Sequence, residues 1–143
     1  MELTIAQKSD LPAVAELEKT FVFPLSENEL IKLSENNTFR IILWKEGEKI
    51  LGHCILFRVL DEAEITSLSV RKDLRGKGIG TAFLTDLLGY LRNDGAKIAY
   101  LDVRESNTAA RKLYEKCGFT EIGRRKRFYQ KPTEDAVAMG IEL

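Results

Sequence analysis

The fold is decided around one stretch, Arg75-Gly76-Lys77-Gly78-Ile79-Gly80, in which three glycines stand between a strand-like segment and a helix-like segment. The strand-like segment runs from Glu64 to Val70, and the helix-like segment runs from Thr81 to Leu91. The N-terminus of a helix carries unpaired N–H groups and a partial positive charge. Because glycines let the backbone approach an anion closely, this order of elements predicts a site for phosphate or pyrophosphate.

The spacing of these glycines argues against two common phosphate-binding loops. A dinucleotide-binding loop needs the pattern G-x-G-x-x-G, whereas the glycines here follow G-x-G-x-G. A P-loop needs Ser or Thr directly after Gly-Lys, and here Lys77 is followed by Gly78. A glycine-rich turn without any ligand stays open as an alternative for the loop taken alone.

Hydrophobic periodicity predicts a mixed α/β fold, with one layer of sheet and helices on its faces, in a single domain over residues 1–143. Asp10 is expected to cap the first helix, and Ser26 with Glu29 forms a capping-box pattern at the second. Two more helices are predicted over 81–91 and 107–116. Strands are predicted over 3–6, 39–45, 50–59, 64–70, 98–103, 119–122 and 136–143.

Composition argues against several classes of partner and site. Lys and Arg number 22, as do Asp and Glu, so the zero net charge predicts no nucleic-acid and no membrane partner. Two cysteines, Cys54 and Cys117, and one histidine, His53, predict no disulfide framework, no metal and no Ser-His-Asp triad. Without a signal-peptide pattern or a membrane-length apolar run, a soluble cytoplasmic protein is expected.

A second motif follows the strand predicted over 98–103. It reads Asn107-x-x-Ala110-x-x-Leu113-Tyr114-x-x-x-Gly118-Phe119. Together with Arg75-x-x-Gly78-x-Gly80, it resembles the GNAT superfamily of acetyl-CoA-dependent N-acetyltransferases over essentially the whole chain. The resemblance implies a mixed, mostly antiparallel sheet of six to seven strands, flanked by about four helices. It also implies that the two central parallel strands, at 64–70 and 98–103, splay apart.

Four further stretches are similar to the bacterial ribosomal-protein-alanine N-acetyltransferases within that superfamily. They are Phe23-Pro24-Leu25-Ser26, Leu60-Asp61-Glu62-Ala63, Val103-Arg104-Glu105-Ser106-Asn107 and Glu134-Asp135-Ala136. The similarity implies acetyl transfer from acetyl-CoA to the α-amino group of an N-terminal alanine. Two other hypotheses stay open: an acetyltransferase for a small amine (a polyamine, amino acid or aminoglycoside), and an acetyl-CoA sensor without catalysis. The chain is expected to be a monomer or a homodimer.

The resemblance also implies a cofactor site. The backbone of Leu68, Ser69 and Val70 is expected to hold the pantetheine and the acetyl group. The loop and the first helical turn are expected to hold the pyrophosphate, and Asn107 is expected to reach the pantetheine. The residues so assigned in the loop and turn are Arg75, Gly76, Lys77, Gly78, Ile79, Gly80 and Thr81.

Acetyl transfer needs a neutral amine, a donor for the oxyanion and an acid for the departing thiolate. Tyr114 is expected to be the acid, although a tyrosine on a helix can equally be a packing aromatic. Asp102 is expected to be the base, acting through a water, where the related enzymes carry glutamate. Glu64, on the strand before the glycine loop, is the rival base. For either carboxylate, the alternative without a catalytic role is a solvated charge on a strand or a salt-bridge partner.

The acceptor side is indicated by two segments. Phe23-Pro24-Leu25-Ser26 is expected to form a turn between the first two helices, and the related enzymes usually have tryptophan at the position of Leu25. Phe128-Tyr129 stands where they carry paired tyrosines. The basic run from Arg124 to Arg127 could steer an acidic partner, or it could protect an edge strand against aggregation.

Overall fold

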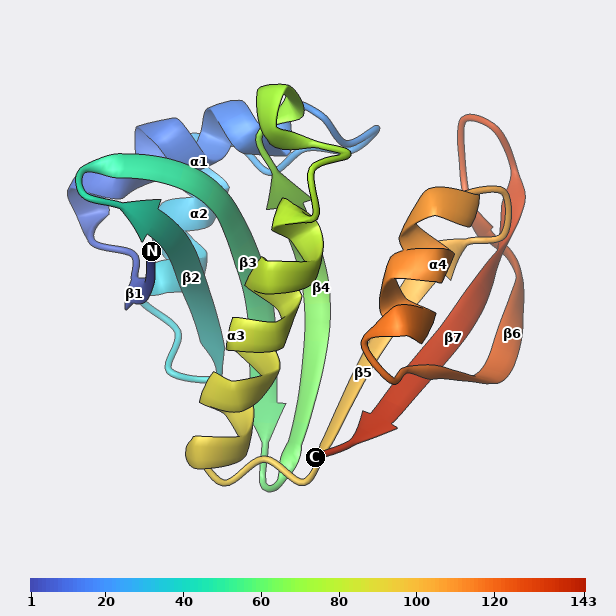
Figure 1. The fold of residues 1–143 in the computed structure, drawn as a ribbon. Helices are drawn as coiled ribbons and strands as arrows, with labels where there is room; N and C mark the ends of the chain where they lie inside the picture. The colour runs from blue at the N-terminus through green and yellow to red at the C-terminus, as the bar shows by residue number, and fades with distance from the viewer.

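One seven-stranded sheet organises the computed structural model, which describes residues 1–143 (Figure 1). The strand order is β1-β2-β3-β4-β5-β7-β6, and every neighbouring pair is antiparallel except β4 with β5. The strands are β1 (Glu2–Ile5), β2 (Phe39–Glu46), β3 (Lys49–Val59), β4 (Glu62–Val70), β5 (Ile98–Arg104), β6 (Thr120–Tyr129) and β7 (Glu134–Glu142).

Four α-helices cover the sheet: α1 (Leu11–Glu18), α2 (Glu27–Ser34), α3 (Ile79–Asn93) and α4 (Thr108–Lys116). The 3₁₀ turns η1 (Lys8–Asp10) and η2 (Lys72–Leu74) precede α1 and the glycine loop. This architecture confirms the α/β fold class, the strand number and the helix number expected from the sequence. No helix combines the length and the apolarity needed to cross a membrane.

The helix caps agree with the sequence in one case and differ in another. At α2, the N–H of Glu29 donates to Ser26 Oγ over 3.2 Å, and the N–H of Ser26 donates to Glu29 Oε1 over 3.1 Å, which confirms the capping box. Asp10 does not cap α1 with its side chain. Its carboxylate instead accepts from the backbone N–H of Gln7 and from Lys45 Nζ.

Two apolar clusters lie on opposite faces of the sheet. The larger one contains the leucine stripe of α3 that the periodicity predicts, with Leu84, Leu87, Leu88 and Leu91 all buried. Trp44 of β2 stacks on Phe83 of α3, with ring centroids 5.5 Å apart. The smaller cluster packs α1 and α2 against the other face through Leu11, Val14 and Leu30. Both faces are thus covered on the β2–β4 side of the sheet.

The first strand of the last hairpin is longer than the sequence predicts. A strand was expected over 119–122, whereas β6 extends from Thr120 to Tyr129 and includes the basic run. Phe119 is buried in the larger cluster and precedes the strand. β6 is an edge strand that pairs with β7 alone, and its pairing is interrupted by register shifts. Arg124 to Arg127 therefore lie on an exposed edge, where charge opposes pairing with another chain.

Substitution of Gly52 is expected to destabilise the central sheet. A Cβ on Gly52 would stand 2.4 Å from the carbonyl oxygen of Ser69 and 3.2 Å from the Phe83 ring, so β4 would have to move. We expect Gly52→Ala to lower the free energy of unfolding by about 1–3 kcal/mol, the usual cost of overpacking. Gly89→Ala is the control, because a Cβ there meets nothing within 4 Å and the substitution stabilises a helix interior. Denaturant unfolding measures the free energy of unfolding of both variants. A Gly52→Ala protein as stable as the wild type would contradict the close approach of Ser69 and Phe83 to Gly52.

Candidate active site

The two central parallel strands part halfway along their length. β4 and β5 pair from Glu62 with Ile98 to Ile65 with Leu101, and no pairing continues beyond these residues. The diverging ends are visible in Figure 1, where β5 leans away from β4 together with β6, β7 and α4. The splay expected from the sequence is therefore confirmed, and it leaves one side of β4 without a strand partner from residue 66 onward.

The backbone of β4 presents alternate residues to this gap. The N–H of Arg71 donates to the carbonyl oxygen of Leu51, so Arg71 turns its polar backbone groups towards β3. Polar groups alternate sides along a strand, and the backbone of Leu68 and Val70 therefore faces the gap. By the same alternation, Ser69 directs its backbone to β3. The free side of the strand thus offers hydrogen-bonding groups at Leu68 and Val70 for an extended ligand.

The glycine loop joins this strand to α3. Gly76 and Gly78 have φ angles of +78° and +77°, a left-handed conformation that side-chain-bearing residues adopt only at a cost. The side chain of Arg75 donates from Nε to the carbonyl oxygen of Val70 over 3.2 Å, which ties the loop to the strand end. No side chain caps α3, so the N–H groups of its first turn stay available for an anion.

Asn107 is the N-cap of α4. Its Oδ1 accepts from the N–H of Ala110 over 3.2 Å, and this bond fixes the start of the helix beside β5. The side-chain oxygen is thus engaged, and the amide NH₂ group is the part of Asn107 left to meet a ligand.

Tyr114 lies on α4 and is half-buried, with its ring 5.9 Å from that of Phe119. Burial, followed by the neighbouring Tyr129, raises the pKa of Tyr114 to about 12. The phenol therefore keeps its proton over the whole physiological range. Burial and then the carboxylate of Asp102 likewise raise the pKa of Tyr129 to about 12.

The two candidate bases occupy different surroundings. Asp102 lies on β5 beyond the point of separation, with 16% of its side chain exposed, and its Oδ1 accepts from Arg125 Nε over 3.2 Å. Glu64 lies where β4 and β5 are still paired, opposite Tyr100, and no side-chain hydrogen bond involves it. The geometry therefore brings Asp102, and not Glu64, beside the opened part of the sheet.

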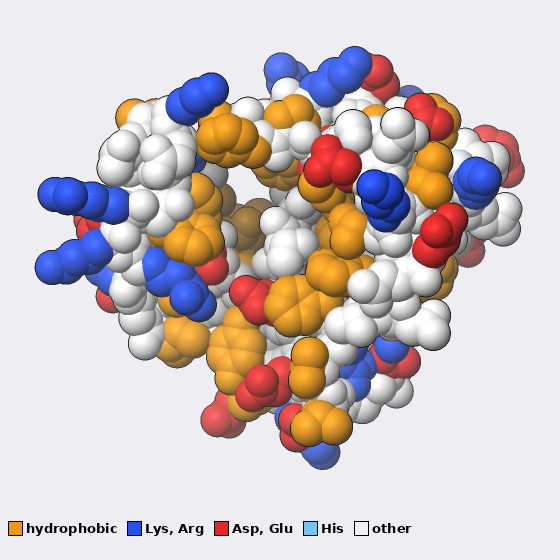
Figure 2. Space-filling model, turned by 180° about the vertical axis from the view of Figure 1, so that it is seen from behind, with side chains coloured by type: hydrophobic (Ala, Val, Ile, Leu, Met, Phe, Trp, Pro, Cys, Tyr) orange, Lys and Arg blue, Asp and Glu red, His pale blue; other side chains and the backbone are white.

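A cleft of roughly 500 Å³ opens next to this region, on the sheet face that α1 and α2 cover. Seen from that side, hydrophobic side chains surround a hollow in the surface (Figure 2). The expected acceptor turn contributes Phe23 and Leu25, and the last hairpin contributes Tyr129. The full lining is Glu18, Phe21, Val22, Phe23, Leu25, Leu33, Phe39, Thr66, Ser67, Arg104 and Tyr129.

Comparison with known proteins decides the family. A model of the acetyltransferase (GNAT) family matches residues 9–119. This chain belongs to the GNAT family. It is accordingly an acetyl-CoA-dependent N-acetyltransferase.

Similar proteins include two curated ribosomal protein bS18-alanine N-acetyltransferases. The one from Escherichia coli K12 is 34% identical over 142 residues, covering 96% of this chain and 94% of the relative. The one from Haemophilus influenzae is 41% identical over 101 residues, 68% of each chain. The crystal structure of the Escherichia coli enzyme superposes with a TM-score of 0.88 at 30% identity, covering 99% of this chain and 92% of that one.

A spermidine N-acetyltransferase from Vibrio cholerae, solved with CoA and spermine, superposes with a TM-score of 0.85. Its identity is 24%, over 99% of this chain and 94% of that chain, so the likeness is one of fold alone. The fold is thus shared between acetyltransferases that are named for different acceptors, a ribosomal protein and spermidine.

Arg104 is a residue of this GNAT site that the sequence did not single out by itself. Its guanidinium donates to the carbonyl oxygens of Gln130 and Pro132 over 2.6 and 3.0 Å, and to Glu134 Oε1 over 3.2 Å. The same group lies 4.6 Å from the centroid of the Tyr129 ring. Arg104 therefore fixes the turn between β6 and β7 and the aromatic wall of the cleft.

Glu134 completes this anchor. Its Oε2 accepts from the backbone N–H of Ser106 over 2.6 Å, at the entrance to α4. That bond, together with Arg104, lowers the pKa of the Glu134 carboxyl. The turn, β5 and the start of α4 are thereby held as one unit around the cleft.

Loss of Arg104 is expected to impair acceptor use more than acetyl-CoA binding. Arg104→Ala removes two hydrogen bonds to carbonyl oxygens of the hairpin turn and one to Glu134 at the start of β7, and a hydrogen bond to a charged group contributes about 1.5–3 kcal/mol. We expect a rise of about tenfold or more in the acceptor KM, since the Tyr129 wall loses its support. Arg104→Lys should not restore it, because an ammonium lacks the planar fork. Arg92→Ala, an exposed position on α3, is the control; an unchanged acceptor KM in Arg104→Ala would contradict the anchor.

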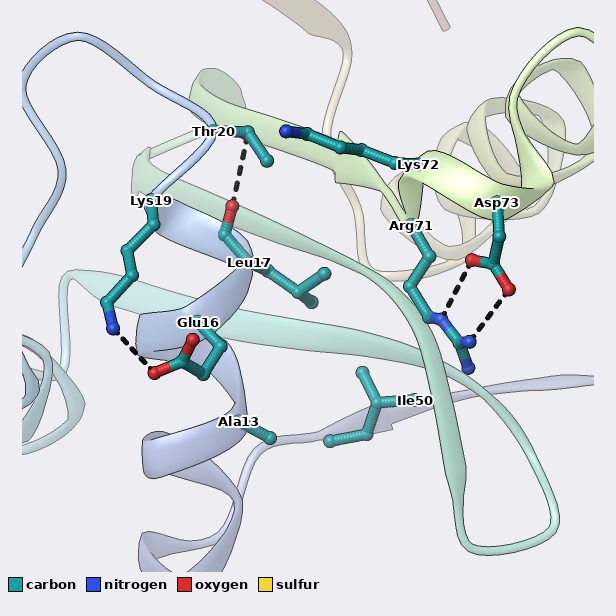
Figure 3. Close-up of a pocket in the computed structure, with 9 residues that line it drawn as sticks. All are labelled: Ala13, Glu16, Leu17, Lys19, Thr20, Ile50, Arg71, Lys72 and Asp73. Atoms are coloured by element: carbon teal, nitrogen blue, oxygen red, sulfur yellow. Dashed lines mark hydrogen bonds and ion pairs between the residues drawn. The ribbon is translucent and has the colours of Figure 1, made fainter.

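A second hollow, of about 630 Å³, lies between α1 and the segment that follows β4 (Figure 3). Its charged side chains are largely paired with one another: Lys19 with Glu16 at 2.7 Å and Arg71 with Asp73 at 2.8 Å. It contains no residue from β5, α4 or the last hairpin. It is therefore a surface trough separate from the cleft that Tyr129 and Arg104 line.

Proposed function

We propose that this chain acetylates the α-amino group of an N-terminal alanine, and that ribosomal protein bS18 is its acceptor. The observation that carries the proposal is the identity of 34% over almost the full length with an enzyme of that name, together with a cleft beside the opened sheet. A cleft lined by the acceptor turn and by Tyr129 leaves room for a peptide end.

The cofactor contacts follow from the geometry of β4. We infer that acetyl-CoA would lie along the free side of the strand, held by the backbone of Leu68 and Val70. Ser69 would contribute less than the sequence suggested, because its backbone faces β3. The pyrophosphate would meet the loop from Arg75 to Gly78 and the N–H groups of Ile79, Gly80 and Thr81, and Lys77 adds a positive charge. The NH₂ group of Asn107 would approach from α4.

Tyr114 is proposed as the proton donor to the departing sulfur. A thiol has a pKa of about 8.5, below the value of about 12 for Tyr114, so complete transfer of the phenolic proton to a thiolate runs uphill. The phenol would therefore stabilise the developing thiolate mainly as a hydrogen-bond donor. Any proton that it releases would be replaced by the proton that the attacking nitrogen loses as the tetrahedral intermediate collapses to the amide, so that the coenzyme leaves as the thiol.

The acceptor places modest demands on the base. An α-amino group has a pKa of about 8 and is about a quarter neutral near pH 7.5, whereas a lysine side chain with a pKa of about 10.4 is neutral only on the order of a tenth of a per cent. Asp102, acting through a water, is therefore proposed as the base for an α-amine. A short carboxylate held by Arg125 suits that acceptor better than it suits lysine.

A panel of acceptors tests the proposal. The protein is incubated with isotopically labelled acetyl-CoA and with peptides that begin Ala, Ser, Gly and Pro, alongside spermidine, free alanine and an aminoglycoside. Mass spectrometry then measures the label in each product. The proposal predicts the highest kcat/KM for alanine peptides. Turnover of small amines alone would favour the second hypothesis, and the absence of turnover with acetyl-CoA binding intact would favour a sensor.

A further inference from the structure

A buried chain of polar side chains runs behind the cleft, and neither the base nor the acid proposed above belongs to it. His53 of β3 is 0% exposed, Glu18 at the end of α1 is 1% exposed, and Ser69 of β4 is 5% exposed. His53 Nδ1 lies 2.5 Å from Ser69 Oγ, and His53 Nε2 lies 2.6 Å from Glu18 Oε2. Sequence spacing alone does not predict a histidine between a serine and a carboxylate here, because the partners are 16 and 35 residues away.

The hydrogen bonds between Glu18, His53 and Ser69 can be satisfied by the following positions of the protons. Glu18 Oε1 accepts from the backbone N–H of Leu25 over 3.1 Å. With Glu18 as a carboxylate, which only accepts, and His53 as a neutral imidazole, His53 donates from Nε2 to Glu18 and accepts at Nδ1 from the hydroxyl of Ser69. Every polar group in the chain then has a partner, which a buried network requires.

The hydrogen-bonded side chains of Glu18, His53 and Ser69 join the two sides of the active site. At one end, Ser69 stands between Leu68 and Val70, the residues whose backbone faces the gap. At the other end, Glu18 lines the cleft and holds Leu25, in the turn that supplies Phe23 to the same cleft. Phe21, which also lines the cleft, packs edge-on against the His53 ring with centroids 6.3 Å apart.

A gain in stability is a weak explanation for a buried network of this kind. Well-packed apolar side chains in place of a buried charged network are often neutral or stabilising, whereas the network adds a defined geometry. The geometry here links β4, which would carry the thioester, to the turn that would carry the acceptor. A displacement of about 1 Å between reacting groups can cost on the order of 10²-fold in rate.

We propose that Glu18, His53 and Ser69 act together as positioning residues that fix the acceptor turn relative to β4, and so set where the acceptor amine stands relative to the thioester. This inference rests on the proposed function for its kinetic consequence only. None of the three residues needs to touch the reacting atoms.

The first test measures kinetics with whichever acceptor the panel identifies. Ser69→Ala and Glu18→Ala should each raise the acceptor KM about tenfold, the scale of one lost hydrogen bond, and leave the Kd for acetyl-CoA within about twofold. Ser69 and Glu18 meet only through His53, so the double variant should be no worse than Glu18→Ala by more than about twofold. If the rise in acceptor KM of the double variant equals the product of the two single rises, Ser69 and Glu18 act independently, and the proposal is overturned. Ser34→Ala, which removes an exposed hydroxyl on α2, is the control.

A conservative variant separates positioning from proton transfer. In Glu18→Gln, the amide can accept from Leu25 and donate to His53 Nε2, while His53 Nδ1 donates to Ser69, so all the bonds persist with the protons reversed. Positioning predicts activity within a few-fold of the wild-type value. A loss of 10² or more in kcat with an unchanged acceptor KM would overturn the proposal and make Glu18 a base.

The second test needs no acceptor, so its failure can be told apart from failure of the proposed function. Amide hydrogen exchange is followed at Leu25 by NMR, in the wild type and in Ser69→Ala. If loss of the Ser69 hydroxyl weakens the bond between Glu18 and the Leu25 amide through His53, this amide should exchange about fivefold to tenfold faster. The exchange of the α3 amides should stay unchanged. Unchanged exchange at Leu25 in a folded Ser69→Ala protein would overturn the inference even if alanine peptides were acetylated.

Discussion

Tyr114→Phe is expected to lower kcat by about 10²–10³ and to leave acetyl-CoA binding unchanged, because the variant removes only the donor that would meet the departing thiolate. Packing should survive, since the ring keeps its contact with Phe119. Stopped-flow or steady-state detection of the released thiol measures kcat, and calorimetry measures the Kd for acetyl-CoA.

The matched control is Tyr90→Phe. Tyr90 lies near the C-terminal end of α3, away from the glycine loop at the N-terminus of the helix, and its hydroxyl accepts from Arg40. A rate for Tyr114→Phe within a few-fold of the wild-type rate would show that Tyr114 is only a packing aromatic.

The pH dependence of the wild type offers a check on the same residue. Loss of the phenolic proton would abolish its donor role, and this happens only as the pH rises through the pKa of about 12. The activity should therefore show no decline attributable to Tyr114 below about pH 10. A fall with a midpoint near pH 8 or 9 would require another group.

Asp102→Asn is expected to lower kcat/KM by about 10² near pH 6.5, and the defect should shrink as the pH rises past about 8. At low pH the acceptor is an ammonium and needs a base, whereas at high pH it arrives without its proton. A complete pH–rate profile of both proteins against one alanine peptide measures the ratio. The shrinking ratio separates loss of a base from simple loss of the Arg125 contact, which would act at every pH.

Glu64→Gln is the matched substitution on the neighbouring strand. Because Glu64 lies in the paired part of β4 and β5, its loss should change the rate by no more than a few-fold at any pH. A larger defect in Glu64→Gln than in Asp102→Asn would transfer the role of base to Glu64.

Local patterns in the sequence account for much of the fold. The capping box at Ser26 and the leucine stripe of α3 are encoded within a few residues, and both are present as expected. The order of strand, glycine loop and helix likewise depends on neighbours in the chain. These features are readable because their period or spacing matches the local geometry of the element.

What depended on distant contacts was not predictable. β6 is exposed along nearly its whole length, so its sequence lacks the alternation of apolar and polar residues by which a strand is recognised. The basic run from Arg124 to Arg127 gives no such pattern. The side chain of Asp10 does not cap α1, because its carboxylate accepts from the N–H of Gln7 and from Lys45, which is 35 residues away. The partners of Arg104 and His53 are likewise distant in sequence, and only the assembled sheet brings them together.

The central claim is tested most directly by one peptide that begins with alanine and carries a lysine further along. It is incubated with the protein and labelled acetyl-CoA, and fragmentation in the mass spectrometer locates the acetyl group. We predict that the label appears on the α-amine and that the lysine stays unmodified while the N-terminal amine is still available. Acetylation of the lysine side chain, or no acetylation of the peptide under conditions where a polyamine is turned over, would contradict a protein N-terminal acetyltransferase.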